Sequence, residues 1–208
     1  MKRIGVIGAG RFGAALVETL SHRGADVIVL DQNAELVQRM SGLATRAVRG
    51  DASDPEALIE GGFKDCDTAV VAIGSNIEGS ILATVNLKDL EVPYIVAKAV
   101  SDLHATVLSR VGANLVVHPN RERAERLARS LLADSLTDYF EVLEGVSVVE
   151  MKAPRAFAGH TLIDSRIRKK YGLTVLAIKR EPDAEKEPEI IISPGGEDVR
   201  EANDTLIL

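Results

Sequence analysis

Residues 4–13 read IGVIGAGRFG, a strand-like run that passes directly into the glycine pattern Gly8-x-Gly10-x-x-Gly13. A helical pattern follows, and the next apolar run, Val27–Leu30, is followed by an aspartate. Strand, glycine turn, helix, strand and acid in this order form the fingerprint of a dinucleotide-binding βαβ unit. The stretch therefore predicts a nucleotide site around the glycine turn.

Each of these residues has a defined part in such a site. Gly8 permits the tight turn, Gly10 lets the backbone approach a pyrophosphate, and Gly13 lets the helix pack closely on the strand. The helix then presents free N–H groups and the positive end of its dipole to the phosphates. Asp31 can accept hydrogen bonds from two ribose hydroxyl groups, and its charge would repel a 2′-phosphate. We therefore expect NADP to bind poorly.

Strand-like and helix-like segments alternate along residues 2–133. Six short apolar strands with helical segments between them predict an α/β fold with a doubly wound parallel sheet of the Rossmann type. The expected strands are Lys2–Ile7, Val27–Leu30, Ala44–Arg49, Thr68–Ile73, Tyr94–Lys98 and Leu115–His118. The expected helices are Phe12–Arg23, Ala34–Ser41, Pro55–Gly61, Ile77–Leu90, Asp102–Val111 and Arg121–Ala133.

The pattern changes after residue 133. The polar stretch Ala133–Asp138 predicts a hinge, and the segments that follow predict a small α+β domain. Its expected strands are Phe140–Leu143, Val146–Met151, Thr174–Ile178, Ile190–Ile192 and Thr205–Leu208, and its expected helix is Ile163–Lys170. We therefore predict two domains, residues 1–133 and 134–208.

Composition argues against several classes of protein. The net charge is −6, aromatic residues make up 3% of the chain and Trp is absent, which argues against a nucleic-acid partner. Cys66 is the single cysteine, which excludes an internal disulfide and a cysteine-based zinc site and fits a reducing cytoplasm. No apolar run approaches the length that spans a bilayer. We predict a cytoplasmic protein that would act at a membrane only through a partner.

The sequence contains no recognisable catalytic constellation beside the nucleotide site. A nicotinamide dehydrogenase needs a group that donates or accepts a proton beside the hydride acceptor. The four histidines, His22, His104, His118 and His160, stand at ordinary positions in helices, a strand end and a turn, without the spacing of a metal site. A binding protein is therefore favoured over an enzyme. The alternative is an NAD-dependent oxidoreductase with an unusually small second domain.

Further candidate ligand contacts follow other strands of the expected sheet. The carboxyl ends of the strands line the ligand crevice in such sheets. Asp51 and Ala52 follow the third strand, where adenine normally lies, and Gly74 follows the fourth. Lys98 ends the fifth strand. Arg11 lies between the second and third fingerprint glycines, where its guanidinium can bind phosphate oxygens of NAD, ATP or ADP.

Beyond the fingerprint, the order of motifs resembles the RCK proteins, the cytosolic regulatory subunits of Trk- and Ktr-type bacterial potassium transporters. In the first part these motifs are IGxGRFG, VxxxDxN (27–33), GDASD (50–54), VVAIGSNIEGS (70–80) and HPN–RA (118–124). In the second part they are Gly159-x-Thr161-Leu162, Arg168-x-x-Tyr171-Gly172 and Pro194-x-x-Glu197-Asp198-Val199. The resemblance extends over essentially the whole chain.

This resemblance implies a nucleotide-binding RCK domain, a C-terminal RCK domain, and dimers arranged as a ring on an integral membrane potassium channel or transporter. The bound ligand would be NAD(H), ATP or ADP. The implied site residues are Gly8, Gly10, Arg11, Phe12 and Gly13 in the turn, Asp31 at the ribose, Asp51 and Ala52 at the adenine, Ile73 and Gly74 after the fourth strand, and Lys98 near the phosphates.

Two further ligands are known in the family. Ktr-type members often have a glutamate after the His-Pro pair that serves a cation site at the dimer contact, whereas this chain has Asn120. Neutral amides bind a hard divalent cation far less well than carboxylates, which argues against that site here. Some members bind cyclic di-AMP between their C-terminal domains. Ile163, Asp164 and Arg168 stand in the matching region, but Arg166 departs from the Ktr-type pattern.

These observations lead to one functional hypothesis. The chain is expected to be a regulatory subunit that senses adenine nucleotides and thereby gates a potassium channel or transporter. A ligand shifts such an equilibrium only by its different affinity for the two states, and Arg11 is the candidate that distinguishes ATP from ADP. The expected helix Arg121–Ala133 is predicted to pack on a second subunit through an apolar stripe, which comprises Ala124, Leu127, Ala128, Leu131 and Leu132.

Overall fold

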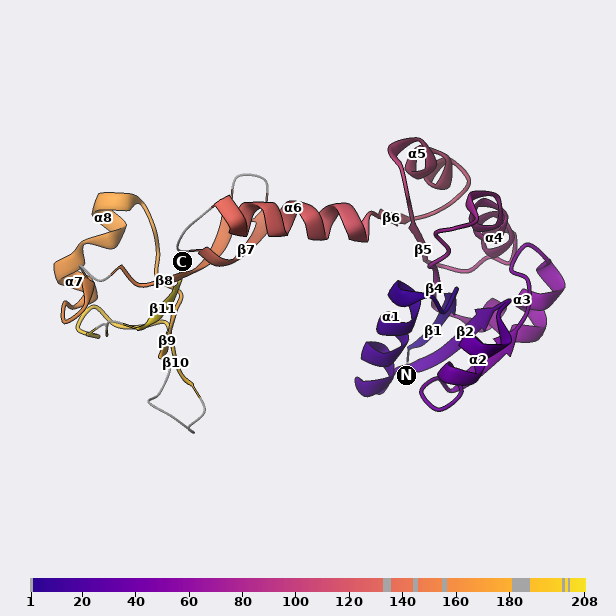
Figure 1. Ribbon diagram of the computed structural model, residues 1–208, viewed down its shortest axis with the longest axis horizontal. Helices are drawn as coiled ribbons and strands as arrows, with labels where there is room; N and C mark the ends of the chain where they lie inside the picture. Colours follow the sequence, from indigo (N-terminus) through magenta and orange to yellow (C-terminus); the bar gives the residue numbers. More distant parts are fainter. Residues whose placement is uncertain are drawn as a thin grey trace. The chain divides into compact units, whose positions relative to one another are not determined.

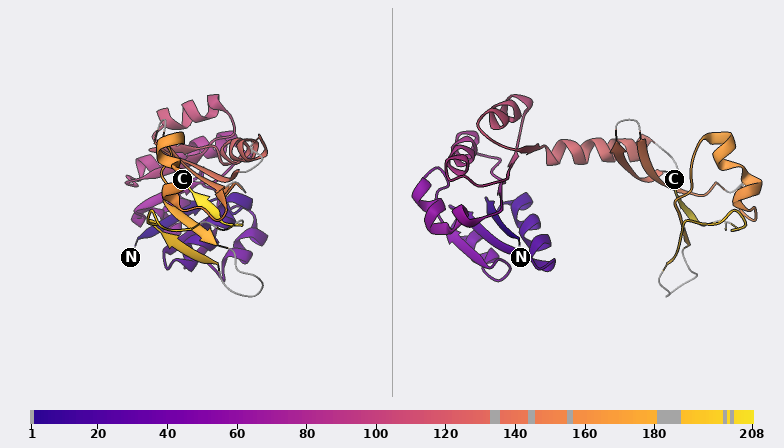
Figure 2. Two further views of the ribbon diagram at one scale, coloured as in Figure 1. Left: turned by 90° about the vertical axis from the view of Figure 1, so that its left-hand side faces the viewer. Right: turned by 180° about the vertical axis from the view of Figure 1, so that it is seen from behind.

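The computed structural model describes residues 2–132, 136–143, 146–154, 157–180, 188–199, 201 and 203–208, with only the backbone for 129, 130, 132 and 136–141. The chain falls into two compact units, Met1–Pro119 and Asn120–Leu208. Figures 1 and 2 show each unit from several sides. The domain boundary expected after residue 133 stays a prediction.

The first unit is built on six parallel strands in the order β3-β2-β1-β4-β5-β6. This arrangement confirms the predicted doubly wound sheet. The strands are β1 (Arg3–Ile7), β2 (Asp26–Asp31), β3 (Arg46–Arg49), β4 (Thr68–Val71), β5 (Ile95–Lys98) and β6 (Leu115–Val117). The helices are α1 (Arg11–His22), α2 (Ala34–Met40), α3 (Pro55–Gly61), the 3-10 turn η1 (Phe63–Asp65), α4 (Ile77–Asp89) and α5 (Asp102–Arg110).

Both faces of this sheet are buried, which explains why its strands read as nearly continuous apolar runs. Successive side chains of a strand point to opposite faces. Val6 and Val29 therefore pack in a cluster with Val17 of α1. Their neighbours Ile7 and Leu30 pack on the other face, in a cluster that also holds residues of α3, α4 and α5. Helices cover both faces of the sheet (Figure 1).

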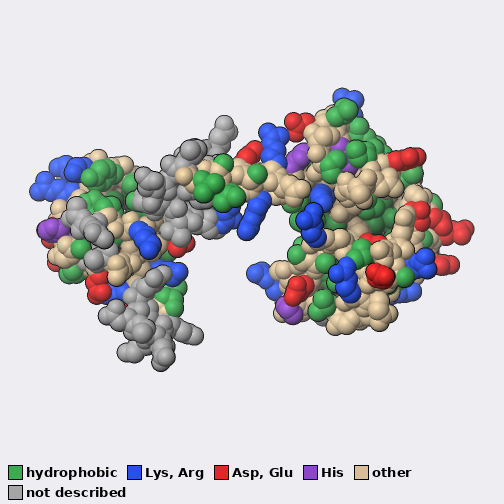
Figure 3. Space-filling view, viewed as in Figure 1, with side chains coloured by type: hydrophobic (Ala, Val, Ile, Leu, Met, Phe, Trp, Pro, Cys, Tyr) green, Lys and Arg blue, Asp and Glu red, His purple; other side chains and the backbone are tan. Residues whose placement is uncertain are grey.

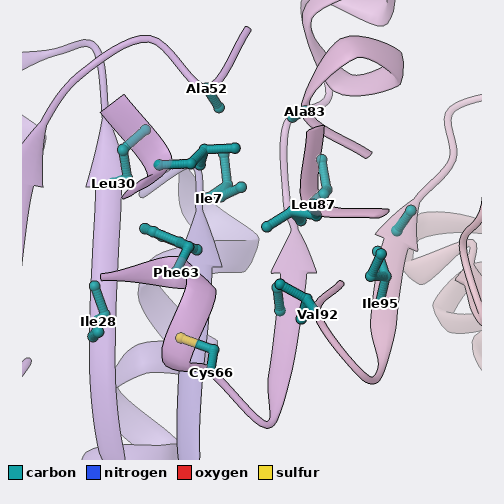
Figure 4. Packing of buried hydrophobic residues seen from close by; sticks show 14 of the residues in the cluster. Ile7, Ile28, Leu30, Ala52, Phe63, Cys66, Ala83, Leu87, Val92 and Ile95 are labelled. Carbon is teal, nitrogen blue, oxygen red and sulfur yellow. The ribbon is translucent and has the colours of Figure 1, made fainter. Parts of the chain in front are cut away.

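Phe63 is the largest fully buried side chain of the second of these clusters. It lies between Ile28 and Ile7, close to Cys66 (Figure 4). A Cβ atom on Gly5 would come within 2.6 Å of the Phe63 ring, so the glycine in the middle of β1 leaves the space that this ring fills. Burial also raises the pKa of the Cys66 thiol to about 11, which keeps it protonated and unreactive at neutral pH.

The second unit contains the helix α6 (Pro119–Leu132), whose first residue ends the first unit, and a five-stranded antiparallel sheet in the order β10-β9-β11-β8-β7. A small core of Ala153, Ile167, Ile178 and Leu206 lies beneath this sheet. The strands are β7 (Leu136–Leu143), β8 (Val146–Lys152), β9 (Ala177–Arg180), β10 (Glu189–Ile192) and β11 (Thr205–Ile207). The short helices are α7 (Leu162–Ser165) and α8 (Ile167–Tyr171).

Two details of the second unit differ from the expectation. The helix expected over Ile163–Lys170 is divided, because Arg166 adopts a left-handed conformation with φ of 47°. The strand expected over Thr174–Ile178 lies instead at Ala177–Arg180, where it pairs with β10 and β11. Arg180, the last residue of β9, binds the buried carboxylate of Asp204.

The expected hinge Ala133–Asp138 is wrong in its second half. Residues 136–138 begin β7, which pairs with β8 through Leu136 opposite Met151 and Asp138 opposite Glu150. Pairing of the backbone with a neighbouring strand outweighs the polar composition of this short segment. Residues 133–135 lie outside the described part of the chain.

Candidate nucleotide-binding site

The site begins at the glycine turn between β1 and α1. Gly8 has a φ of 95°, a left-handed conformation that favours glycine, and its N–H donates to the Leu30 carbonyl at 2.8 Å. A Cβ atom on Gly13 would lie 1.9 Å from the Gly8 carbonyl oxygen, so only glycine allows α1 to approach the turn this closely. A Cβ atom on Gly10 would meet nothing within 4 Å. The turn is therefore open toward solvent at Gly10 and closed at Gly13.

The carboxylate of Asp31, at the end of β2, faces this turn. One carboxylate oxygen accepts a hydrogen bond from the Ala9 N–H at 2.6 Å, and the other accepts one from the Asn33 N–H at 2.8 Å. The acid thus joins the end of β2 to the glycine turn. Carboxylate oxygens can each accept more than one hydrogen bond, so these contacts leave capacity for ribose hydroxyl groups.

The loop after β3 forms another wall of the site. Its Gly50 N–H donates to the Asp31 carbonyl at 3.1 Å. Asp51 accepts hydrogen bonds at 2.7 and 2.9 Å from the hydroxyl and N–H groups of Ser53, and these contacts lower the pKa of Asp51. Asn86 of α4 donates to the carbonyl groups of Ala52 and Ser53, both at 3.0 Å. The loop is held from both sides and carries an ionised carboxylate.

The ends of β4 and β5 meet at the opposite side. Gly74 follows β4, and a Cβ atom there would lie 2.9 Å from the Lys98 ammonium nitrogen. The same ammonium lies 5.8 Å from the centre of the Phe12 ring. Asn76 caps α4 by accepting a hydrogen bond from the Gly79 N–H at 2.9 Å. A lysine and a helix N-terminus therefore stand near each other at this end.

A cleft of about 250 Å³ lies between these segments. It is at the carboxyl ends of β1 and β4, between which the strand order reverses, and ligands bind at such positions in open α/β sheets. Seven of the eleven predicted site residues line the cleft, namely Gly8, Gly10, Asp31, Asp51, Ala52, Ile73 and Gly74. The other four, Arg11, Phe12, Gly13 and Lys98, do not line it.

Those four residues lie beside the cleft in different ways. Gly13 is buried under the turn, and Phe12 and Lys98 lie against each other. Arg11 begins α1 and is exposed. That these eleven residues contact a ligand stays a prediction.

Nine residues that line the cleft are not among the eleven predicted site residues, and they are Ile7, Leu30, Gln32, Leu36, Gly50, Ala72, Ser75, Asn76 and Gly79. Gln32 follows the ribose-side acid directly, which is a usable signal. Gly79 lies within the motif VVAIGSNIEGS (70–80), and this motif is the signal that could have found it. Leu36 gave no signal, because it reads as an ordinary apolar residue of α2 and also packs against the core.

The described residues hold neither a cluster of metal ligands nor a membrane-spanning helix. No group of three or more His, Cys, Asp or Glu side chains in that part of the chain is placed to hold a metal ion. None of the helices described is both long enough and apolar enough to cross a membrane.

Comparison with known proteins agrees with the geometry. Residues 4–119 match the TrkA-N domain, and residues 146–208 match the TrkA-C domain. The chain belongs to the TrkA family. Among its relatives, Ktr system potassium uptake protein C of Bacillus subtilis (strain 168) is 41% identical over 207 residues, which span 100% of this chain and 91% of that protein. The resemblance to RCK regulatory subunits is thereby confirmed.

Solved structures similar to this TrkA-family chain carry nucleotides. GsuK bound to ADP has a TM-score of 0.53 and 25% identity, over 63% of this chain and 34% of that one. The Kef CTD of Shewanella denitrificans in AMP-bound form has a TM-score of 0.54 and 25% identity, over 64% of this chain and 84% of that one. Both contain an adenine nucleotide.

Proposed function

We propose that this TrkA-family chain is a cytoplasmic regulatory subunit of a potassium uptake system, and that it binds an adenine nucleotide in the cleft. The nucleotide changes the conformation of the subunit, and this change gates a membrane potassium channel or transporter. The name of the 41% identical relative supports the potassium uptake role. The ADP and AMP in the two similar structures support the class of ligand.

The chemistry of the cleft walls is the observation that carries this proposal. The open backbone at Gly10 gives a phosphate access to the N-terminus of α1. The Asp31 carboxylate stands where it can accept bonds from ribose hydroxyls. At the far wall, Asp51 offers an acceptor to an exocyclic amine, and the Ala52 backbone borders the same space. The cleft therefore has one group suited to the phosphate, one to the ribose and one to the adenine.

Isothermal titration calorimetry on the full chain tests the ligand class. ATP, ADP, NAD, NADH and NADP are titrated into one preparation, with GTP as a control for the base. We expect at least one of the first four to bind, and NADP and GTP to bind more weakly. A chain that binds none of these adenine nucleotides would contradict the proposal.

A regulatory role also requires that the bound nucleotide is not consumed. The same preparation, supplied with NAD and a panel of 2-hydroxy acids, should show no hydride transfer when absorbance of NADH is followed. Robust turnover would instead support the NAD-dependent oxidoreductase. Among the described residues that line the cleft, Asp31 and Asp51 are the only titratable side chains, and the proposal places them at the ribose and at the adenine.

Gating requires a membrane partner and a second copy of the chain. We propose that the partner is the integral membrane subunit of the potassium transporter, and that the chain assembles as dimers in a ring. Potassium flux into liposomes that hold the membrane subunit, measured with and without this chain and with each nucleotide, tests the coupling. Flux that does not respond to the chain or to nucleotide would overturn the gating proposal.

The C-terminal domain is a candidate site for cyclic di-AMP. Ile163, on α7, is 58% exposed, and Asp164 and Arg168 are also exposed. Titration of cyclic di-AMP into the same preparation tests this ligand, with linear di-AMP as the control. A divalent cation is not proposed, because Asn120 stands in place of the carboxylate.

A further inference from the structure

His104 makes three hydrogen bonds inside the first unit. Its Nε2 lies 2.8 Å from the hydroxyl oxygen of Ser80, and its Nδ1 lies 3.4 Å from the Val100 backbone nitrogen. Its own backbone N–H donates to the Ser101 hydroxyl, which caps α5, at 3.2 Å. The His104 side chain is 2% exposed and Ser80 is fully buried, so neither can touch a substrate.

The partners determine where the proton sits on the imidazole. The Val100 backbone nitrogen can only donate, so Nδ1 must be the acceptor. The proton is then on Nε2, which donates to the Ser80 oxygen, while the Ser80 hydroxyl donates to the Ile77 carbonyl at 2.9 Å. Neutral His104 is therefore the form that satisfies all of these groups.

These contacts reach two segments of the nucleotide site. Ile77 and Ser80 belong to the first turn of α4, and Gly79 between them lines the cleft. Val100 lies in the loop after β5, two residues beyond Lys98, whose ammonium stands close to Gly74 at the cleft wall. His104 thus joins the N-terminus of α4 to the segment that carries Lys98.

We propose that His104 is a positioning residue for the phosphate end of the nucleotide cleft, and that its protonation uncouples the α4 N-terminus from the Lys98 segment and weakens nucleotide binding. This inference rests on the proposed nucleotide-binding function. Protonation places an N–H on Nδ1 directly facing the Val100 N–H, so that two donors oppose each other in a buried space. The loop after β5 must then move away, and Lys98 moves with it.

Burial favours the neutral form of His104. Burial, and then the charge of His118 at the end of β6, lower the pKa of His104 below its ordinary value. The packed elements also carry Glu78 in the first turn of α4, Asp102 in the first turn of α5 and Lys98 on β5, with Lys88, Asp89 and Arg110 at the far ends of the two helices. The folded chain therefore takes up this proton at a lower pH than an exposed histidine does.

The pH dependence of NAD binding tests the proposal on the full chain. NAD is the probe because its pyrophosphate does not titrate between about pH 5.5 and 8, unlike the terminal phosphate of ATP. We expect the affinity of the wild type to fall at least about fivefold toward the acid end. Adenosine, which has no phosphate, should show no such step. The midpoint should match the titration of the His104 imidazole followed by NMR.

Two variants of His104 test its contacts with Ser80 and with Val100 separately, and a variant of another histidine is the control. His104→Gln can still donate to Ser80 but cannot be protonated, so its NAD affinity should be independent of pH. His104→Asn can accept from the Val100 N–H but is too short for Ser80. His22→Gln, at the exposed end of α1, should keep the wild-type pH step.

The outcomes distinguish this inference from the proposed function. If the wild type binds no nucleotide at any pH, both fail. If NAD binds and His104→Gln retains the wild-type pH step, only the role of His104 is overturned. If the variants fail to fold, NMR on the wild type still tests the proposal. The amide signals of Gly79 and Val100 must then shift with the same pH midpoint as the His104 imidazole. Signals that shift with another midpoint, or not at all, contradict the proposal.

Discussion

The carboxylate of Asp31 accepts a hydrogen bond from the Ala9 N–H at 2.6 Å, so the acid predicted to bind a ribose already holds the glycine turn. This contact gives the residue two roles. It fixes the position of the backbone that approaches the phosphates, and its carboxylate oxygens can still accept hydrogen bonds from the ligand. A change at Asp31 will therefore affect the turn as well as the ribose.

Replacing Asp31 tests this double role. Asp31→Ala should weaken every ribose-containing ligand by about 1.5–3 kcal/mol, the cost of lost hydrogen bonds to a charged group. It should also lower the unfolding temperature, because the Ala9 and Asn33 N–H groups lose their acceptor. Calorimetry and thermal unfolding on the same samples measure both. Tight binding of NADP by the wild type would remove Asp31 from the ribose.

Two of the glycines of the turn, Gly10 and Gly13, give a matched pair of variants. Gly13→Ala should destabilise the fold by about 1–3 kcal/mol or more, because the new Cβ atom would lie 1.9 Å from the Gly8 carbonyl oxygen. Gly10→Ala should leave stability within about 0.5 kcal/mol, since nothing lies within 4 Å and the φ of −65° suits any residue. Nucleotide binding should nevertheless weaken in Gly10→Ala. Equal urea midpoints for the two variants would contradict the geometry of the turn.

Arg11 begins α1 outside the cleft and is exposed, so its guanidinium is free to reach the end of a phosphate chain. Arg11→Ala should reduce affinity for ATP more than for NAD, because ATP has more phosphate charge to lose its partner. Arg11→Lys, which keeps the charge but not the paired donors, is the control. Equal losses for ATP and NAD would mean that Arg11 contacts only the shared diphosphate.

The apolar residues of α6 test the predicted assembly. In the isolated chain Leu127 is 57% exposed and Leu131 is 75% exposed, and Figure 3 shows green side chains among the blue ones along this helix. Leu131→Glu should lower the oligomeric mass while circular dichroism stays native, because an interface would gain a desolvated charge. Arg123→Glu, also on α6, controls for the change of charge.

Two outcomes would contradict the assembly prediction. Light scattering that gives the wild-type mass for Leu131→Glu would show that this position lies outside the contact between subunits. A variant that unfolds outright would place Leu131 in the core of its own unit. The apolar stripe also includes Leu132, whose side chain is outside the described part of the chain.

The sequence by itself determined the first unit and the order of its ligand-facing segments. Local signals were sufficient there: glycine spacing fixes the turn, and apolar runs at a strand's period specify a sheet buried on both faces. The helices expected to begin at Pro55 and Asp102 do begin there, and the preceding residues Asp54 and Ser101 cap them. Asp31, Asp51 and Gly74 reach the same cleft because parallel strands bring their carboxyl ends to one edge.

Only the tertiary structure decided which of these groups have partners and what lies behind the cleft. His104 read as an ordinary residue on a helix, yet it is buried and bound to Ser80, 24 positions earlier in the chain. The strand that begins at Leu136 depends on pairing with β8, and Arg180 of β9 binds the buried carboxylate of Asp204. Such contacts join residues that are distant in the sequence, so no local pattern of spacing or polarity encodes them.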